Sequence, residues 1–361
     1  MAHSNHAESN GAAKKVAILI ENRFSDLAVK ILRTALQQAN AAVTIVGSRM
    51  NEEYQSAQGT LLIRPDATAT EVSAEDFDAL VITGGSIRTN PNVVRLVTDA
   101  VIHNKWIAAV GDGPQVLIEA NELAGKNVTG ARAIRKDLEN ARANYLDAPT
   151  IVDGHMITAR RPGDLPIFAA MLLRSLGLNV DFPDTTDPNH EWWVLGEAWG
   201  GSSRKEIVQA LNMAIVGERY TLEEFKHYLY RVTNRDFHLL LEELCDVKRS
   251  HVKRLENRLR SAFETEVSWQ ARGSEAYATL QSWLQASDEI AILRRVLGDL
   301  QTGVVDAYRL CHQLSDPLTA DILDIVEHDL SEYEQRLAAI YRARLKAHLQ
   351  PPLPTTVPAV H

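Results

Sequence analysis

The alternation of short apolar runs with amphipathic segments over residues 14–178 is the feature that most constrains the fold of this chain. The runs of strand length are residues 16–20, 43–46, 79–83, 107–110, 128–130, 150–152 and 156–158. The segments with apolar side chains at helical spacing are residues 26–39, 93–103 and 165–176. Strands that alternate with helices form a parallel sheet covered on both faces. We therefore expect a flavodoxin-like three-layer α/β sandwich with a mostly parallel sheet.

The pattern changes near residue 204 and is helical almost throughout from there to residue 347. Four long segments carry apolar side chains at three- and four-residue spacing, namely 204–232, 235–266, 288–314 and 318–347, and a shorter helix is expected at 274–286. Asp288 and Asp316 suit N-cap positions, and Pro317 suits a first helical turn. Two helix pairs joined by a central connector predict an antiparallel four-helix bundle.

A length of 361 residues is more than one ordinary domain needs, so we expect two domains. The expected divisions are a disordered tail at 1–13, an α/β domain at 14–178, a Trp-rich linker at 179–203, a helical bundle at 204–347 and a disordered Pro-rich tail at 348–361. The linker carries Trp192, Trp193 and Trp199. They either anchor the linker on a domain surface or bind a protein partner, since tryptophan is enriched at binding hot spots.

Composition excludes several classes of function. The net charge of −9 argues against a nucleic-acid partner, which would require a basic face. No apolar run approaches the roughly 18–20 residues that span a bilayer, and the first residues contain no apolar signal core. The two cysteines, Cys245 and Cys311, do not form a disulfide framework, which suits a reducing compartment. We therefore expect a cytoplasmic protein.

Residues 106–120 read as an apolar strand, a sharp Gly-rich turn and a helix. Such a strand–turn–helix elbow is where a nucleophile can be held exposed above a parallel sheet. The turn here reads Gly111-Asp112-Gly113-Pro114. Gly111 has no side chain with which to attack a substrate.

The sequence around this elbow resembles the ThiJ/PfpI superfamily of class I glutamine amidotransferase-like domains, whose elbow usually reads Ala-Ile-Cys-His-Gly-Pro. The cysteine position holds Gly111 and the histidine position holds Asp112, while Gly113 and Pro114 match. The resemblance covers residues 14–178: residues 134–141 are similar to the family's Ile-Arg-x-Asp-Leu-x-Asn-Ala stretch and residues 158–166 to its Thr-Ser-Arg-x-Pro-x-Asp-Leu-Pro stretch. The elbow is also similar to that of the C-terminal domain of large-subunit catalases, which shares the fold and lacks the nucleophile.

The resemblance implies a third changed position, at the end of the first strand. The family's Asp-Gly-Phe-Glu supplies an acid that hydrogen-bonds the thiol, whereas this chain reads Asn22-Arg23-Phe24-Ser25, so that Ser25 replaces the acid. A thiolate nucleophile requires both its sulfur and the neighbours that lower its pKa. Loss of all three side chains predicts a pseudoenzyme with no catalytic residue at the elbow.

Two alternatives remain for residual chemistry. Asp112 could act as nucleophile or base, but an aspartate two residues before a proline at a helix start is also a good N-cap, and we expect the capping role. Cys245 and Cys311 fall on expected helices of the other domain, where each is expected to be a small core residue.

The helical domain resembles the ferritin-like superfamily in length and in its pair–connector–pair arrangement. Di-iron bundles of that kind require a Glu from each of two helices and a Glu-x-x-His from each of the other two. The ligands that the sequence offers are Glu218, His251, Asp306 (or Asp299) and Glu327. Lys248 stands three residues before His251, where the motif requires Glu, and a cation there opposes a metal. The alternative is that these acids form solvated or salt-bridged helix faces. We expect no cofactor, with iron or manganese in the bundle as the alternative.

Three functions follow from these residues and resemblances. The first is a catalytically degenerate, stress-related ThiJ/PfpI-like protein that acts as a structural or interaction module; the resemblance implies a homo-oligomer. The second is a ferritin-like oxidoreductase or iron-handling protein working through the bundle. The third is a hydrolase, glyoxalase or deglycase of the ThiJ/PfpI type that uses Asp112. We expect the first.

Overall fold

The computed structural model describes residues 13–49, 52–84, 86–178, 187, 190–265 and 288–348. The chain divides into two compact units: Met1–Ser203 with Gln313–Leu318, called the α/β unit, and Arg204–His312 with Thr319–His361, called the helical unit. The helix expected at 274–286 lies outside the described residues, as do the two expected tails except for residues 13 and 348.

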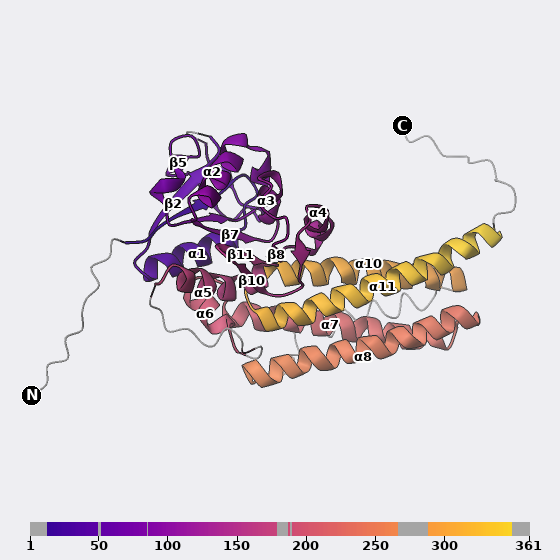
Figure 1. Ribbon diagram of the computed structural model, residues 1–361. Helices are drawn as coiled ribbons and strands as arrows, with labels where there is room; N and C mark the ends of the chain where they lie inside the picture. Colours follow the sequence, from indigo (N-terminus) through magenta and orange to yellow (C-terminus); the bar gives the residue numbers. More distant parts are fainter. Residues whose placement is uncertain are drawn as a thin grey trace, which may run out of the picture. The chain divides into compact units, whose positions relative to one another are not determined.

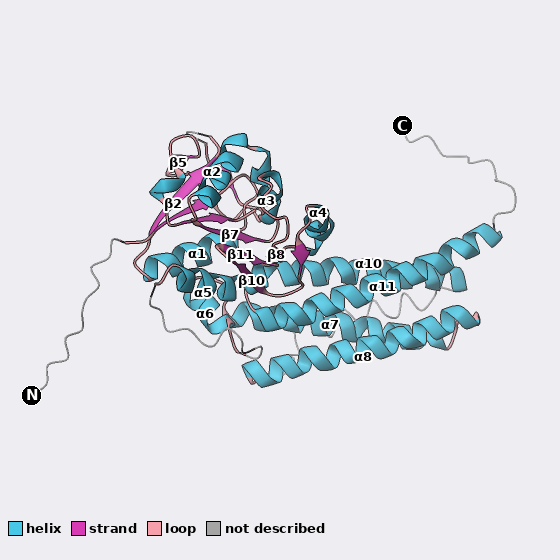
Figure 2. Ribbon diagram, viewed as in Figure 1, coloured by secondary structure: helices cyan, strands magenta, loops and turns pink. Residues whose placement is uncertain are grey.

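The α/β unit is built on a seven-stranded sheet (Figure 2). In spatial order its strands are β10 (Thr150–Asp153), β11 (Met156–Ala159), β7 (Trp106–Val110), β6 (Ala79–Ile82), β1 (Lys15–Leu19), β2 (Ala42–Gly47) and β5 (Ala67–Thr68). All neighbours pair in parallel except β10 and β11, which form an antiparallel hairpin at one edge. The expected α/β class and mostly parallel sheet are confirmed.

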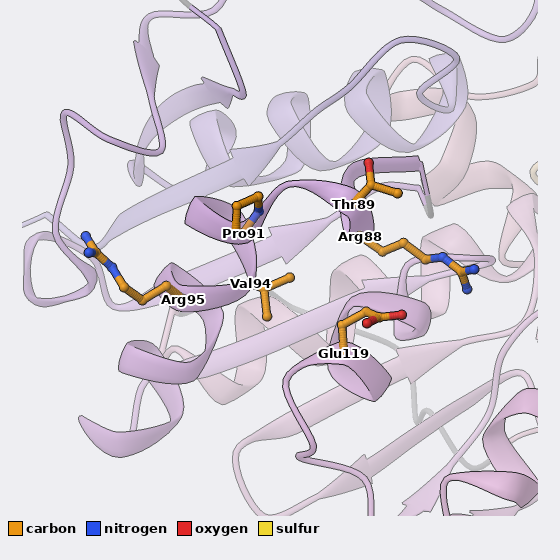
Figure 3. Close-up of a pocket in the computed structure, with 6 residues that line it drawn as sticks. All are labelled: Arg88, Thr89, Pro91, Val94, Arg95 and Glu119. Atoms are coloured by element: carbon orange, nitrogen blue, oxygen red, sulfur yellow. The ribbon is translucent and has the colours of Figure 1, made fainter.

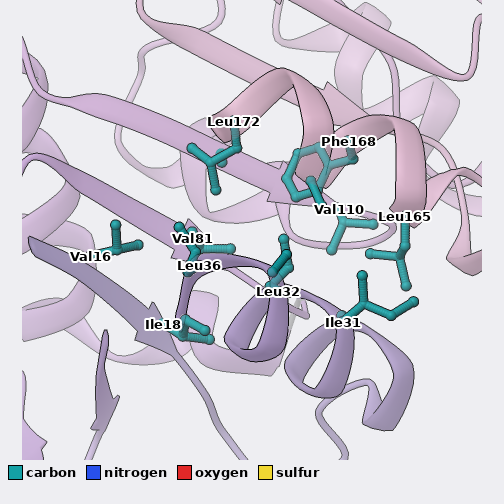
Figure 4. Close-up of a cluster of buried hydrophobic side chains, with 14 of the residues drawn as sticks. Val16, Ile18, Ile31, Leu32, Leu36, Val81, Val110, Leu165, Phe168 and Leu172 are labelled. Atoms are coloured by element: carbon teal, nitrogen blue, oxygen red, sulfur yellow. The ribbon is translucent and has the colours of Figure 1, made fainter. Parts of the chain in front are cut away.

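Helices cover both faces of this sheet because the strands are apolar on both sides. In β1, Val16 and Ile18 belong to one buried cluster, while Ala17 and Leu19 belong to another. The first cluster is formed with α1 (Asp26–Gln38) and α5 (Leu165–Ser175), and Figure 4 shows its side chains converging between these helices and the strands. The second is formed with α2 (Pro91–Ile102), α3 (Pro114–Glu119) and α4 (Arg135–Asn140). The result is a three-layer sandwich (Figure 1).

The α/β unit also contains short strands and 3-10 turns outside the seven-stranded sheet. Two small sheets pair β3 (Tyr54–Gln55) with β4 (Leu62–Ile63) and β8 (Asn127–Val128) with β9 (Asn144–Tyr145). The 3-10 turns in the described part of this unit are η1 (Ala74–Asp76), η2 (Ser86–Thr89), η3 (Arg132–Ile134) and η4 (Pro162–Asp164). The expected strand at 128–130 is a two-residue strand of a side sheet, since only Asn127 and Val128 pair.

The tryptophan-rich segment packs into the α/β unit through α6 (Trp193–Ala198). Trp192 and Trp199 are each 2% exposed and belong to the cluster beneath α1 and α5. Residues 313–318 complete this region: the backbone N–H of Ser202 donates to Ser315 Oγ at 2.7 Å, and the N–H of Ser315 donates to Ser202 Oγ at 3.0 Å. Trp192 and Trp199 therefore anchor their own segment and present no surface to a partner.

The helical unit contains four long helices in the described residues: α7 (Arg204–Leu229), α8 (Arg235–Phe263), α10 (Glu289–Gln313) and α11 (Pro317–His348). They lie side by side around one apolar core to which all four contribute (Figure 1). Asn234 caps α8 by accepting from the N–H of Phe237, and Asp288 accepts from the N–H of Ile290 at the start of α10. Each expected long helix is present, with ends that differ by a few residues. Within the described ranges, every helix is too short or too polar to cross a lipid bilayer.

Candidate functional site

The elbow follows β7, a central strand that pairs with β6 and β11. The N–H of Gly111 donates to the carbonyl of Ala159 at 3.0 Å, and the carbonyl of Gly111 accepts from Ala131 at 3.0 Å. Helix α3 begins three residues later with Pro114. The backbone of the elbow is thus hydrogen-bonded on one side to the end of β11 and on the other to the loop at Ala131.

Gly111 and Gly113 are glycines for different reasons. Gly111 has φ of +62°, a left-handed conformation that disfavours other residues, yet a Cβ built there would meet nothing within 4 Å. Gly113 has an ordinary helical backbone, but a Cβ there would lie 2.7 Å from the carbonyl oxygen of Ile82. The elbow therefore retains the open space that a nucleophile would occupy, and Gly113 allows the turn to approach β6.

Asp112 does not cap α3. The N-cap position is Gly113, and no side chain makes a capping hydrogen bond there. Asp112 is exposed, and no hydrogen bond or ion pair of its side chain is found in the described part of the chain. The expected capping role is wrong because α3 begins one residue too late for Asp112 to reach its first N–H groups.

The acid position is occupied by a residue with a structural role. The hydroxyl of Ser25 accepts from the N–H of Ala28 at 3.3 Å and caps α1. Arg23, two residues earlier, has φ of +69°, a conformation that suits the glycine of the family pattern better than arginine. Since Ser25 and Gly111 both follow the carboxyl ends of parallel strands, they lie at the same edge of the sheet, where such folds bind ligands.

The stretch at 158–166 also has a structural explanation. Arg160 Nε lies 3.1 Å from Oδ2 of the fully buried Asp164, and Arg160 Nη1 lies 3.0 Å from Oδ1 of Asp147. The buried carboxylate of Asp164 is thereby paired, as buried charges must be. The likeness to the family at residues 158–166 therefore reflects a shared fold and does not indicate a reactive group.

A hollow of about 510 Å³ lies between η2, α2 and the end of α3 (Figure 3). Its lining residues are Arg88, Thr89, Pro91, Val94, Arg95 and Glu119. Neither Ser25 nor the elbow residues Gly111 and Asp112 line it, and Glu119 belongs to the opposite end of α3 from the elbow.

A cluster of charged side chains lies inside the helical unit. Glu218 of α7 accepts from Lys248 Nζ at 2.8 Å on Oε1, and its Oε2 lies 2.8 Å from Nδ1 of His251. His251 Nε2 lies 3.0 Å from Oδ2 of Asp329 on α11. Burial alone would raise the pKa of Glu218, but the Lys248 ammonium and the hydrogen bond with His251 outweigh it and hold that pKa below its usual range.

A second set of polar side chains extends this cluster toward α10. Tyr228 donates its hydroxyl to Glu224 Oε1 at 2.6 Å, and Arg295 Nε lies 3.6 Å from the same oxygen and 3.4 Å from Asp299 Oδ2. Burial, and then the neighbouring Glu224 carboxylate, raise the pKa of Asp299 to about 7. Burial and the hydrogen bond to Glu224 likewise raise the pKa of the Tyr228 phenol.

The structure brings together two of the four expected metal ligands, Glu218 and His251. Asp306 is outside this cluster: its side chain is 58% exposed and lies 3.7 Å from Arg309. Glu327 is half-buried, but Asp329, two residues further along α11, is the acid that reaches His251. In the described residues no group of three or more His, Cys, Asp or Glu side chains is arranged to hold a metal ion.

Asp329, Glu224 and Arg295 are members of the cluster that the sequence pattern does not single out. Asp329 stands three residues after the buried Val326 and four before Tyr333, a spacing that places it beside the core face of α11. Glu224 stands four residues before Tyr228, with which it bonds. A search for the Glu-x-x-His motif does not find Asp329 or Glu224, because the motif describes metal ligands and not ion pairs or hydrogen bonds between side chains.

Both cysteines are buried and form no disulfide, as expected of small core residues. Burial raises the pKa of the Cys245 thiol to about 11. Cys311 is 2% exposed, and its thiol lies 3.5 Å from the carbonyl oxygen of Ala320. Neither can replace the missing elbow nucleophile, since both are buried on helices of the helical unit.

Comparison with known proteins agrees with this architecture. A crystal structure of a two-domain protein from Anabaena variabilis, containing DJ-1/ThiJ/PfpI-like and ferritin-like domains, is 44% identical, has a TM-score of 0.87 and covers 95% of this chain and 99% of its own. An uncharacterized protein of Archaeoglobus fulgidus is 37% identical over 166 residues, which are 45% of this chain and 98% of that protein. General stress protein 18 of Bacillus subtilis is 32% identical over 160 residues, 43% of this chain and 93% of its own.

The model of the DJ-1/PfpI family matches residues 14–175. That range contains the whole seven-stranded sheet, the elbow after β7 and α5. The chain therefore belongs to the DJ-1/PfpI family and continues into a helical region like that of its two-domain neighbour.

Proposed function

We propose that this protein is a catalytically inactive member of the DJ-1/PfpI family that acts as a homo-oligomeric structural or interaction module in a stress-related role. The observation that carries this is the elbow. Its backbone and its open space are kept, yet the cysteine position is Gly111 and the acid position, Ser25, is occupied in capping α1.

Among the described residues of the turn 111–114, no nucleophile with a positioned base replaces the missing thiol. A covalent mechanism requires a nucleophile, a base within hydrogen-bond reach and a group that orients the base. Asp112 is the one ionisable side chain of the turn 111–114, and in the described residues its carboxylate has no partner that would orient it or raise its basicity. A hydrolase, glyoxalase or deglycase working through Asp112 is therefore poorly supported.

The stress-related role rests on likeness, since a similar protein carries the name general stress protein 18. Self-association rests on what the family resemblance implies. A cytoplasmic location is proposed because both cysteines are thiols and not a disulfide, which suits a reducing compartment.

Two measurements on the full chain test this proposal. Sedimentation equilibrium should give a mass of two or more times the 40.1 kDa of one chain. A single 40.1 kDa species at all concentrations would contradict the oligomer. Dicarbonyl, ester and peptide substrates should turn over no faster with wild type than with Asp112→Ala. Turnover that the wild type shows and Asp112→Ala abolishes would establish the hydrolase or glyoxalase alternative instead.

A second function, iron handling or oxidation through the helical unit, is favoured by one contact. Glu218 and His251, two side chains of types that bind iron, lie 2.8 Å apart inside the helical unit. Bound iron or manganese lost in Glu218→Ala would support this function.

A further inference from the structure

The helical unit encloses a lysine in its interior. Lys248 is 2% exposed, and its ammonium lies 2.8 Å from Glu218 Oε1 and 5.5 Å from the centroid of the Phe225 ring. Lysine is almost never fully buried unless it is paired, because an isolated ammonium loses its hydration at a cost of several kcal/mol per ion. The carboxylate and the ring face are what make this position tolerable for a cation.

The neighbouring histidine, His251, also contacts carboxylates through both of its ring nitrogens. His251 is 1% exposed, with Glu218 at Nδ1 and Asp329 at Nε2. Each ring nitrogen of His251 therefore already has a carboxylate oxygen within hydrogen-bond distance. A metal ion could bind His251 only by displacing one of these two contacts, since a ligand histidine coordinates the metal through a ring nitrogen.

Ferritin-like bundles that bind two metal ions gather carboxylates and histidines in the bundle core, with a Glu three residues before each ligand histidine. Here that position is Lys248, on the same face of α8 as His251. A divalent cation bound by Glu218 would lie a few ångströms from the ammonium and would repel it strongly in a low-dielectric core. The residues present therefore do not fit a metal ion.

We propose that the Lys248 ammonium takes the place of a metal ion in this bundle, balancing Glu218 and allowing the polar core to persist without a divalent cation. A second cation, the partly exposed Arg295, lies 3.6 Å from Glu224 and 3.4 Å from Asp299. Cationic side chains balance the buried carboxylates. The bundle is therefore a scaffold whose stability does not depend on the supply of metal ions.

The first test uses the wild-type chain, purified, stripped with chelator and titrated with Mn²⁺, Fe²⁺ or Zn²⁺ in a calorimeter. Wild type should take up well under one ion per chain, and its unfolding midpoint should be the same with chelator and with metal. Saturable binding of about one or two ions per chain, with a midpoint that falls on chelation, would overturn the proposal.

The second test replaces the cation itself. Lys248→Glu places a carboxylate three residues before His251 and removes the competing charge, so we expect metal binding of about one ion per chain and a raised unfolding midpoint in its presence. Lys253→Glu, an exposed position on the same helix, is the matched control and should gain nothing. A folded Lys248→Glu variant that binds no more metal than Lys253→Glu would contradict the place assigned to the ammonium. If Lys248→Glu does not fold with or without metal, the wild-type titration decides.

Discussion

Lys248 Nζ lies 2.8 Å from Glu218 Oε1, and the two side chains are only 3% and 7% exposed. The pair joins α7 to α8 inside the helical unit, at positions that a metal-binding bundle would use for ligands. A buried pair of this kind is costly to desolvate, so breaking it is expected to cost more than forming it gains.

Lys248→Met should therefore destabilise the helical unit by about 3–5 kcal/mol, because Glu218 would be left buried without its counter-ion. The measurement is chemical unfolding followed by circular dichroism. Lys226→Met is the control: that lysine is 39% exposed in a surface pair with Glu223, and its loss should change the free energy of unfolding by less than about 1 kcal/mol.

Combining Lys248→Met with Glu218→Gln removes both charges of the pair. The double variant should lose clearly less stability than the sum of the two single variants. Additive losses would show that Lys248 and Glu218 do not depend on each other.

Asp299 should make the stability of the helical unit depend on pH. Its folded pKa, about 7, lies above the ordinary value of 3.8, so the folded chain binds the proton more tightly than the unfolded chain does. The stabilising contribution is fully present below the ordinary value and is lost as pH rises through about 7. Asp299→Asn should flatten this decline, which unfolding curves collected across that range would reveal. Parallel pH profiles of wild type and Asp299→Asn would contradict the raised pKa.

Gly113 and Gly111 should respond differently to a single methyl group. Gly113→Ala forces a Cβ against the backbone of β6 and of Val110, so we expect a loss of about 3 kcal/mol. Gly111→Ala meets no neighbour and suffers only the strain of its positive φ, about 1 kcal/mol. Thermal unfolding of the two variants provides the comparison, and equal losses would show that the approach of Gly113 to Ile82 is not tight.

Gly111→Cys should restore a sulfur without restoring chemistry. The side chain has room, but Asp112 adds a negative charge next to it and Ser25 replaces the family's acid with a hydroxyl, so we expect a thiol pKa at or above the usual value of about 8.5. The pH dependence of alkylation by iodoacetamide measures it, with wild type as the background because Cys245 and Cys311 are buried. A thiol pKa below about 7 would show that the site still activates a nucleophile.

Much of the fold could be predicted from the sequence because the spacing of apolar residues indicates which side chains are buried. Strand β1, buried from Val16 to Leu19, reads as a continuous apolar run, and α1 repeats apolar side chains along one face. The pairs Tyr54–Ile63 and Asn127–Asn144 could not be predicted, since two-residue strands carry no period.

The elbow could be located because its chemistry is local in the sequence, whereas the buried charge cluster could not. Glu218, His251 and Asp329 stand on three helices, and their contact depends on the rotation of each helix about its axis. Each position turns a side chain by about 100° around a helix, so Glu327 and Asp329, two positions apart, point in directions about 160° apart. The sequence marks Lys248 as an obstacle to metal, and the structure adds that it is the partner of Glu218.

The most direct test of a metal-independent helical unit is ferrous iron oxidation by the full chain, purified without chelator and with its metal content measured on the same sample. We predict metal well below one ion per chain and oxidation no faster than buffer alone. About two irons per chain, with oxidation that Glu218→Ala abolishes, would make this protein a di-iron enzyme and contradict the role of a metal-independent scaffold.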